Sequence, residues 1–85
     1  MANEKHRYTL TLDGRPPDDL GRMCEQSARL IVALRLSQTS RRVTWGPMGW
    51  TPTGLDGVDV INIYAWTEAD NVPRYCGELR REVVA

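Results

Sequence analysis

Residues 58–66 read VDVINIYAW, and this stretch decides the fold because its side chains are apolar on both faces. Alternate side chains of an extended strand point to opposite sides of the sheet. One face then carries Val58, Val60, Tyr64 and Trp66, and the other carries Ile61, Ile63 and Ala65. Such a strand is typical of the middle of a sheet. We expect the small branched side chains to pack under helices and the aromatic set to lie on the other face.

Two other segments are predicted to be strands. Residues 5–12, KHRYTLTL, alternate strictly, so that His6, Tyr8, Leu10 and Leu12 share one face. Threonine and tyrosine also favour extended structure. Residues 41–45, RRVTW, form a shorter strand, and we expect residues 1–4 to be frayed.

Residues 19–38 have helical spacing and predict the first helix, which should end near Gln38. Its apolar stripe consists of Leu20, Cys24, Ser27, Ala28, Ile31 and Leu34, widened by Met23, Leu30 and Val32. The preceding turn, DGRPPDD, puts Pro17 into the first helical turn and Asp18 and Asp19 at the positive end of the helix dipole.

A second helix is predicted over residues 67–84, where the spacing of the apolar side chains is again helical. Asp70 is the expected N-cap, with Pro73 in the first turn. One face of this helix carries Val72, Cys76, Leu79 and Val83. Thr67 with Asp70 is a rival capping signal that would start the helix earlier.

Together these elements predict one small α+β domain over residues 1–85, in the order strand, helix, strand, strand, helix. The simplest arrangement is a three-stranded, mainly antiparallel sheet with both helices packed on one face. Two helices cover only that face, so the other face is left as an apolar patch. Patches of this kind tend to be interaction surfaces.

Charge and cysteine content narrow the class of protein. Eleven basic residues balance eleven acidic ones, which argues against a binder of duplex nucleic acid, because such a protein carries a basic excess. The sequence shows no signal peptide and no apolar run of about 20 residues, so we expect a cytoplasmic protein. Cys24 and Cys76 are expected to be buried free thiols in a reducing compartment.

Residues 41–54, RRVTWGPMGWTPTG, put Trp45 and Trp50 on either side of a Gly-Pro-Met-Gly turn. The turn-rich loop extends over residues 46–57. Two interpretations stay open. Both indoles can cover the core, or one of them is exposed and binds a partner, since tryptophan is a common anchor at interfaces.

No catalytic or metal-binding constellation is visible in the sequence. His6, Cys24 and Cys76 lack the spacing of zinc ligands, and both cysteines fall on predicted core stripes, where a thiol is inert. We therefore expect a protein that is not an enzyme and that uses no cofactor or metal.

The sequence favours a small interaction module, of the accessory, adaptor or inhibitor type, that binds another protein or a second copy of itself. The candidate binding residues are Trp45, Met48, Trp50, Val60, Tyr64, Trp66, Arg41 and Arg42. One alternative is a binder of single-stranded nucleic acid or nucleotides that uses arginine pairs and aromatic stacking. Another is a ligand-binding or catalytic dimer with a pocket between its subunits.

Overall fold

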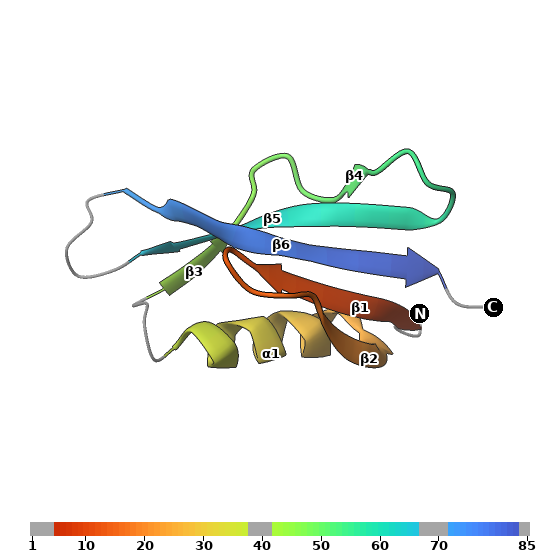
Figure 1. Ribbon diagram of the computed structural model, residues 1–85, viewed down its shortest axis with the longest axis horizontal. Helices are drawn as coiled ribbons and strands as arrows, with labels where there is room; N and C mark the ends of the chain where they lie inside the picture. The colour runs from red at the N-terminus through yellow and green to blue at the C-terminus, as the bar shows by residue number, and fades with distance from the viewer. Residues whose placement is uncertain (1–4, 38–41, 67–71, 84–85) are drawn as a thin grey trace.

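The computed structural model describes residues 5–37, 42–66 and 72–83, which form six strands and one helix (Figure 1). Their order along the chain is β1 (Lys5–Leu12), β2 (Asp18–Cys24), α1 (Glu25–Leu36), β3 (Arg42–Trp45), β4 (Thr51–Pro52), β5 (Val58–Trp66) and β6 (Arg74–Val83). Within the described residues, no helix is long and apolar enough to cross a membrane.

All the strands pair antiparallel in one sheet with the order β2-β1-β6-β5-β3. β4 also pairs with β5, so β3 and β4 share one edge of the sheet. The connection from β2 to β3 runs through α1, and it takes the chain from one edge strand to the other. In Figure 1 the helix lies along one side of the sheet, below β1, and β2 is drawn across its right-hand end.

The core lies between α1 and the sheet. Leu10 of β1, Leu79 of β6 and Ile61 of β5 stand directly beside one another on three adjacent strands, and all three are buried. The same core contains Tyr8, Ile63, Ala28, Val32 and Leu36. The prediction that Ile61, Ile63 and Ala65 form the covered face of β5 is confirmed, because all three are buried.

The predicted three-stranded sheet with two helices is wrong. Residues 74–83 form β6, a strand in the middle of the sheet, and they pair with β1 on one side and β5 on the other. Backbone pairing on both sides outweighs the local helical preference of this glutamate- and arginine-rich segment. The N-cap predicted at Asp70 lies outside the described residues, as do residues 1–4.

The first helix also begins later than predicted. Residues 18–24 form β2, which turns back along β1, and α1 starts at Glu25. Asp19 does not serve a helix N-terminus: Arg7 Nε donates to its carboxylate over 3.2 Å, and the Gly21 amide donates to it over 3.0 Å. These two bonds hold the pKa of Asp19 below its ordinary value.

The helix is rotated relative to the predicted stripe. Its buried residues are Ala28, Val32 and Leu36, whereas Leu30 and Leu34 are 61% and 62% exposed. Glu25 and Arg29, at the start of the helix, form ion pairs that extend to Arg81 of the sheet, and this contact fixes which side of α1 faces the core.

Candidate interaction surface

The face of the sheet opposite α1 is not covered by any helix of the described residues. We call it the open face and define it by Val58, Val60, Tyr64 and Trp66 of β5 and by Tyr75, Glu78, Arg80 and Glu82 of β6. The four β5 side chains alternate with the buried Ile61, Ile63 and Ala65, and each of them is partly accessible. Three of the predicted binding residues, Val60, Tyr64 and Trp66, therefore lie together on one accessible surface.

The open face is more polar than the sequence suggested. Glu82, Arg80 and Glu78 of β6 pair with Val58, Val60 and Asn62 of β5, and directly paired residues project from the same side of a sheet. Residues 74–83 form a strand and not the predicted helix. Their three charged side chains therefore project onto this face, which we expected to be apolar. The open face thus carries apolar and aromatic side chains along β5, interrupted by the exposed Asn62, and is flanked by charges of alternating sign on β6.

Aromatic side chains gather at one end of the open face. The rings of Tyr64 and Tyr75 meet edge to face with their centroids 5.9 Å apart, and Tyr75 is 49% exposed. The guanidinium of Arg42 lies 5.1 Å from the centroid of the Trp66 ring. Arg42, a predicted binding residue, thereby lies at the open face, whereas Arg41 lies outside the described residues. Tyr75 was missed because it was assigned to a helix.

Trp45 and Trp50, on either side of the Gly-Pro-Met-Gly turn, lie on the other side of the sheet. Trp45 pairs with Ile63 and shares its helix-covered face, and both Trp45 and Trp50 pack against the core. The amide of Gly49 donates to the carbonyl of Gly46 and closes the turn, which leaves Met48 82% exposed. The structure therefore favours the interpretation in which both indoles cover the core, and it separates them from the open face.

Each indole is held by an arginine from a distant part of the chain. The guanidinium of Arg29 lies 4.6 Å from the Trp45 ring centroid, and that of Arg81 lies 4.2 Å from the Trp50 ring centroid. Glu25 joins the two arginines, with oxygen–nitrogen distances of 2.7 Å to Arg29 and 3.4 Å to Arg81. These stacked cations and the bridging carboxylate fasten the loop to the helix and to β6.

The Arg81 guanidinium also donates to the carboxylate of Asp59 over 3.2 Å, so one side chain connects α1, β5 and β6. Tyr8 lies beside this cluster, with its ring centroid 6.1 Å from that of Trp50. Burial, and secondarily the charge of Glu25, raise the pKa of Tyr8, so the phenol stays protonated at neutral pH. We interpret this cluster as structural support for the loop.

The two cysteines are free thiols in different surroundings, and neither is fully buried. Cys24 is the N-cap residue of α1, and a hydrogen bond with the Ser27 hydroxyl at 3.3 Å lowers the pKa of its thiol. Cys76 donates to the Ile63 carbonyl over 3.4 Å, and burial raises its pKa. The sequence analysis predicted that both are inert core thiols. In the structure they have different hydrogen-bond partners, and their pKa values shift in opposite directions.

We expect Cys24 to react several-fold faster than Cys76 with iodoacetamide at pH 7.5, because the thiolate is the reactive form. Mass spectrometry of the two cysteine-containing peptides over time measures both rates. Ser27→Ala should slow Cys24 and leave Cys76 unchanged, because it removes the hydrogen bond to one thiol only. Equal rates at the two positions would contradict the assignment.

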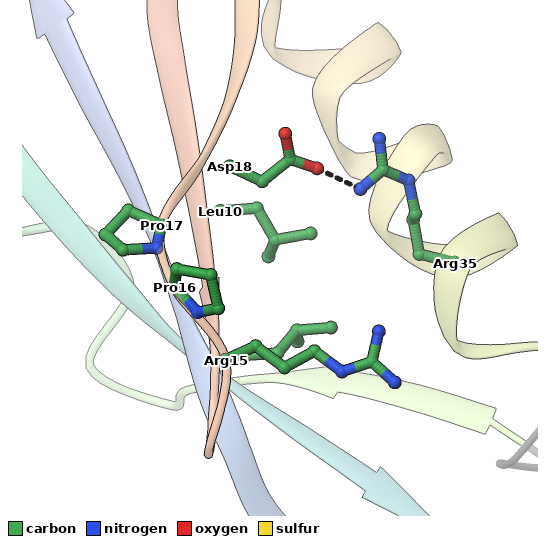
Figure 2. A pocket seen from close by; sticks show the side chains of 7 residues that line it. Leu10, Arg15, Pro16, Pro17, Asp18 and Arg35 are labelled. Carbon is green, nitrogen blue, oxygen red and sulfur yellow. Dashed lines mark hydrogen bonds and ion pairs between the residues drawn. The ribbon is translucent and has the colours of Figure 1, made fainter.

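A cavity of about 360 Å³ opens on the helix side of the sheet, between the β1–β2 loop and the last turns of α1 (Figure 2). It is lined by Leu10, Leu12, Arg15, Pro16, Pro17, Asp18 and Arg35. None of these residues was a predicted site residue, because residues 13–19 were interpreted only as the turn that leads into the first helix. The double proline after Asp-Gly was the available signal, since it predicts a rigid turn.

Comparison of the chain with protein-family models, curated proteins and solved structures finds no match.

Proposed function

We propose that this chain is a non-enzymatic interaction module that binds a second copy of itself through the open face. The observation that carries the proposal is the accessible apolar strip of β5, which lies on a face that no helix of the described residues covers. The backbone of β5 is paired on both sides, so a partner meets its side chains and not its hydrogen-bonding edge. Apolar side chains placed in this way favour packing of one sheet on another.

The charges of β6 favour a second copy as the partner. Glu78, Arg80 and Glu82 alternate in sign along one side of the strand, with Arg80 flanked by the two glutamates. When two copies pack about a twofold axis across the strands, β6 of one runs opposite to β6 of the other, and Arg80 of each can meet a glutamate of its partner. Such a contact is complementary to itself, as a twofold interface requires.

Three aromatic side chains supply the expected anchors of this interface. Tyr64, Tyr75 and Trp66 lie at one end of the apolar strip, and tyrosine and tryptophan are enriched among residues that dominate binding energy. A standard interface requires about 800 Å² from each partner. The molecule exposes 5972 Å² in total, so a dimer of this size covers a modest share of its surface.

Cytoplasmic location is part of the proposal. It is supported by the two free thiols, because unpaired cysteines are typical of a reducing compartment. The proposal assigns no catalytic step to the chain, since the polar clusters on the helix side serve to hold the tryptophan loop in place.

Binding of single-stranded nucleic acid is the second candidate, favoured by the stacking of Arg42 on Trp66 beside two tyrosines. Glu78 and Glu82 oppose it, because they place negative charge in the middle of the surface that would follow the phosphates. A fluorescent single-stranded oligonucleotide titrated at low and high salt tests it, since phosphate binding weakens as salt rises.

Analytical ultracentrifugation of the wild-type chain and three variants tests the homodimer. We expect Arg80→Glu to weaken dimerisation at least tenfold, because it places like charges together. The triple variant Glu78→Arg, Arg80→Glu, Glu82→Arg inverts all three charges, restores the alternation and should recover much of the affinity. Leu30→Arg introduces a charge on the exposed side of α1 and serves as the control. A wild-type chain that stays monomeric at several hundred micromolar, or an equal effect of Leu30→Arg and Arg80→Glu, would refute the proposal.

A further inference from the structure

The cavity beside the β1–β2 loop has an apolar floor and one apolar wall. Leu10, which is 1% exposed, and Leu12 project from β1 toward the helix and form the floor. Pro16 and Pro17 form the wall on the loop side. Because two successive prolines fix the backbone torsion φ, this wall is rigid before any ligand arrives. A volume of about 360 Å³ suits a small organic molecule.

Two arginines converge on this cavity from opposite sides. Arg15 extends from the loop toward the helix, and Arg35 extends from the helix toward the loop, with Leu10 between them (Figure 2). Arg35 forms an ion pair with Asp18, whereas the Arg15 side chain forms no ion pair with the described residues. The side chains of Arg35 and Asp18 are 48% and 45% exposed, so their pair contributes little to stability and can be exchanged for another anion.

We propose that this cavity binds a carboxylate carried on an apolar body. A guanidinium binds a carboxylate through two parallel hydrogen bonds, and Arg15 has all of its donors available for one. The leucines and prolines supply the surface for the apolar body. Asp18 favours a single negative charge over the double charge of a phosphate monoester, because its own carboxylate lies in the lining.

This site is independent of the proposed dimer. The cavity lies on the helix side of the sheet, and the open face lies on the opposite side. A variant that abolishes ligand binding in the cavity is therefore expected to leave dimerisation intact. Either proposal can be refuted without refuting the other.

Octanoate is a suitable probe, and octanamide is its uncharged counterpart of nearly the same shape. Titration of the ¹⁵N-labelled chain with each, followed by NMR, should give saturable shifts at residues 10–18 and in the last turn of α1. Octanoate should bind about tenfold more tightly than octanamide, which corresponds to one charge-assisted hydrogen-bonding contact. Absence of saturable shifts, shifts mapped elsewhere or equal binding of the two probes would overturn the proposal.

Three variants test the roles of the charged residues. Arg15→Gln should weaken octanoate binding about tenfold, whereas Asp18→Asn should strengthen it because it releases Arg35. Arg22→Gln is the matched control, because it removes an exposed arginine of β2 that is not part of the cavity lining. If Arg15→Gln and Arg22→Gln have the same effect on affinity, the cavity is not the carboxylate site.

The carboxylate can come from a free organic acid or from the C-terminus of a peptide, and a peptide arm separates these sources. An acetylated tetrapeptide that ends in leucine with a free carboxylate is compared with the same peptide as its amide. Tighter binding of the free-acid peptide than of octanoate assigns the site to chain ends. Tighter binding of octanoate assigns it to small organic acids.

Discussion

Replacement of Gly77 by alanine is expected to destabilise the chain by about 3 kcal/mol. A Cβ atom at this position would lie 2.3 Å from the Thr11 carbonyl oxygen and 2.9 Å from the Leu12 Cα atom. Both neighbours are backbone atoms of β1, so no side-chain rotation relieves the contact. The backbone torsion φ of +156° adds strain for any residue other than glycine. Chemical denaturation measures the loss of unfolding free energy.

The position of Gly77 explains why this change is severe. A bulge at Cys76 interrupts the register of β6 against β5, and Gly77 pairs with Leu12 on one side and Ile63 on the other. A chain of this length has roughly 4–13 kcal/mol of total stability, so the loss is a large share of it. Gly54→Ala is the control, because Gly54 also has positive φ, +95°, but open space around it. It should cost about 1 kcal/mol. Equal costs would contradict the close approach of β6 to β1.

Leu79→Ala is also expected to cost about 3 kcal/mol, by removing a fully buried side chain from the middle of the core. Leu79 lies between Leu10 of β1 and Ile61 of β5, and α1 covers all three. Because every direction is filled, the surrounding side chains cannot collapse into the space. The same denaturation experiment, performed at low concentration, measures the effect.

Two control variants accompany Leu79→Ala: one tests the effect of burial, and the other tests whether residues 74–83 form a strand or a helix. Leu30→Ala makes the same chemical change at a residue that is 61% exposed, and it should cost under about 0.5 kcal/mol. Val83 would share the buried face with Leu79 if residues 67–84 were helical, but it is 67% exposed in β6. Val83→Ala is therefore expected to be nearly neutral. A large cost at Val83 would support the helix.

Strict alternation was sufficient to predict β1 and β5 and the buried side of each. It was not sufficient for residues 74–83, because two periods fit that segment equally well. Cys76, Leu79 and Val83 match a helix, while Glu78, Arg80 and Glu82 match one side of a strand. The choice between them is made by pairing with β1, about seventy residues earlier in the chain, and such pairing leaves no local signal.

The candidate site shows the same limit. The pattern of β5 was enough to put Val60, Tyr64 and Trp66 on one face, but the charges beside them followed only from β6 being a strand. The sequence also left the position of Trp45 and Trp50 open. Their burial depends on Arg29 and Arg81, which come from the helix and from β6, and no spacing rule links those arginines to the loop.

The central place of β6 has a consequence for biosynthesis. A ribosome completes β6 after the five other described strands, yet β6 is the strand that joins β1 to β5. Without β6, the β1–β2 pair and the group of β3, β4 and β5 share no strand pairing, and each has a free edge where β6 belongs. Free edges of this kind pair readily with other chains. A product that ends before residue 74 is therefore expected to aggregate, and the native sheet closes only once β6 is in place between β1 and β5.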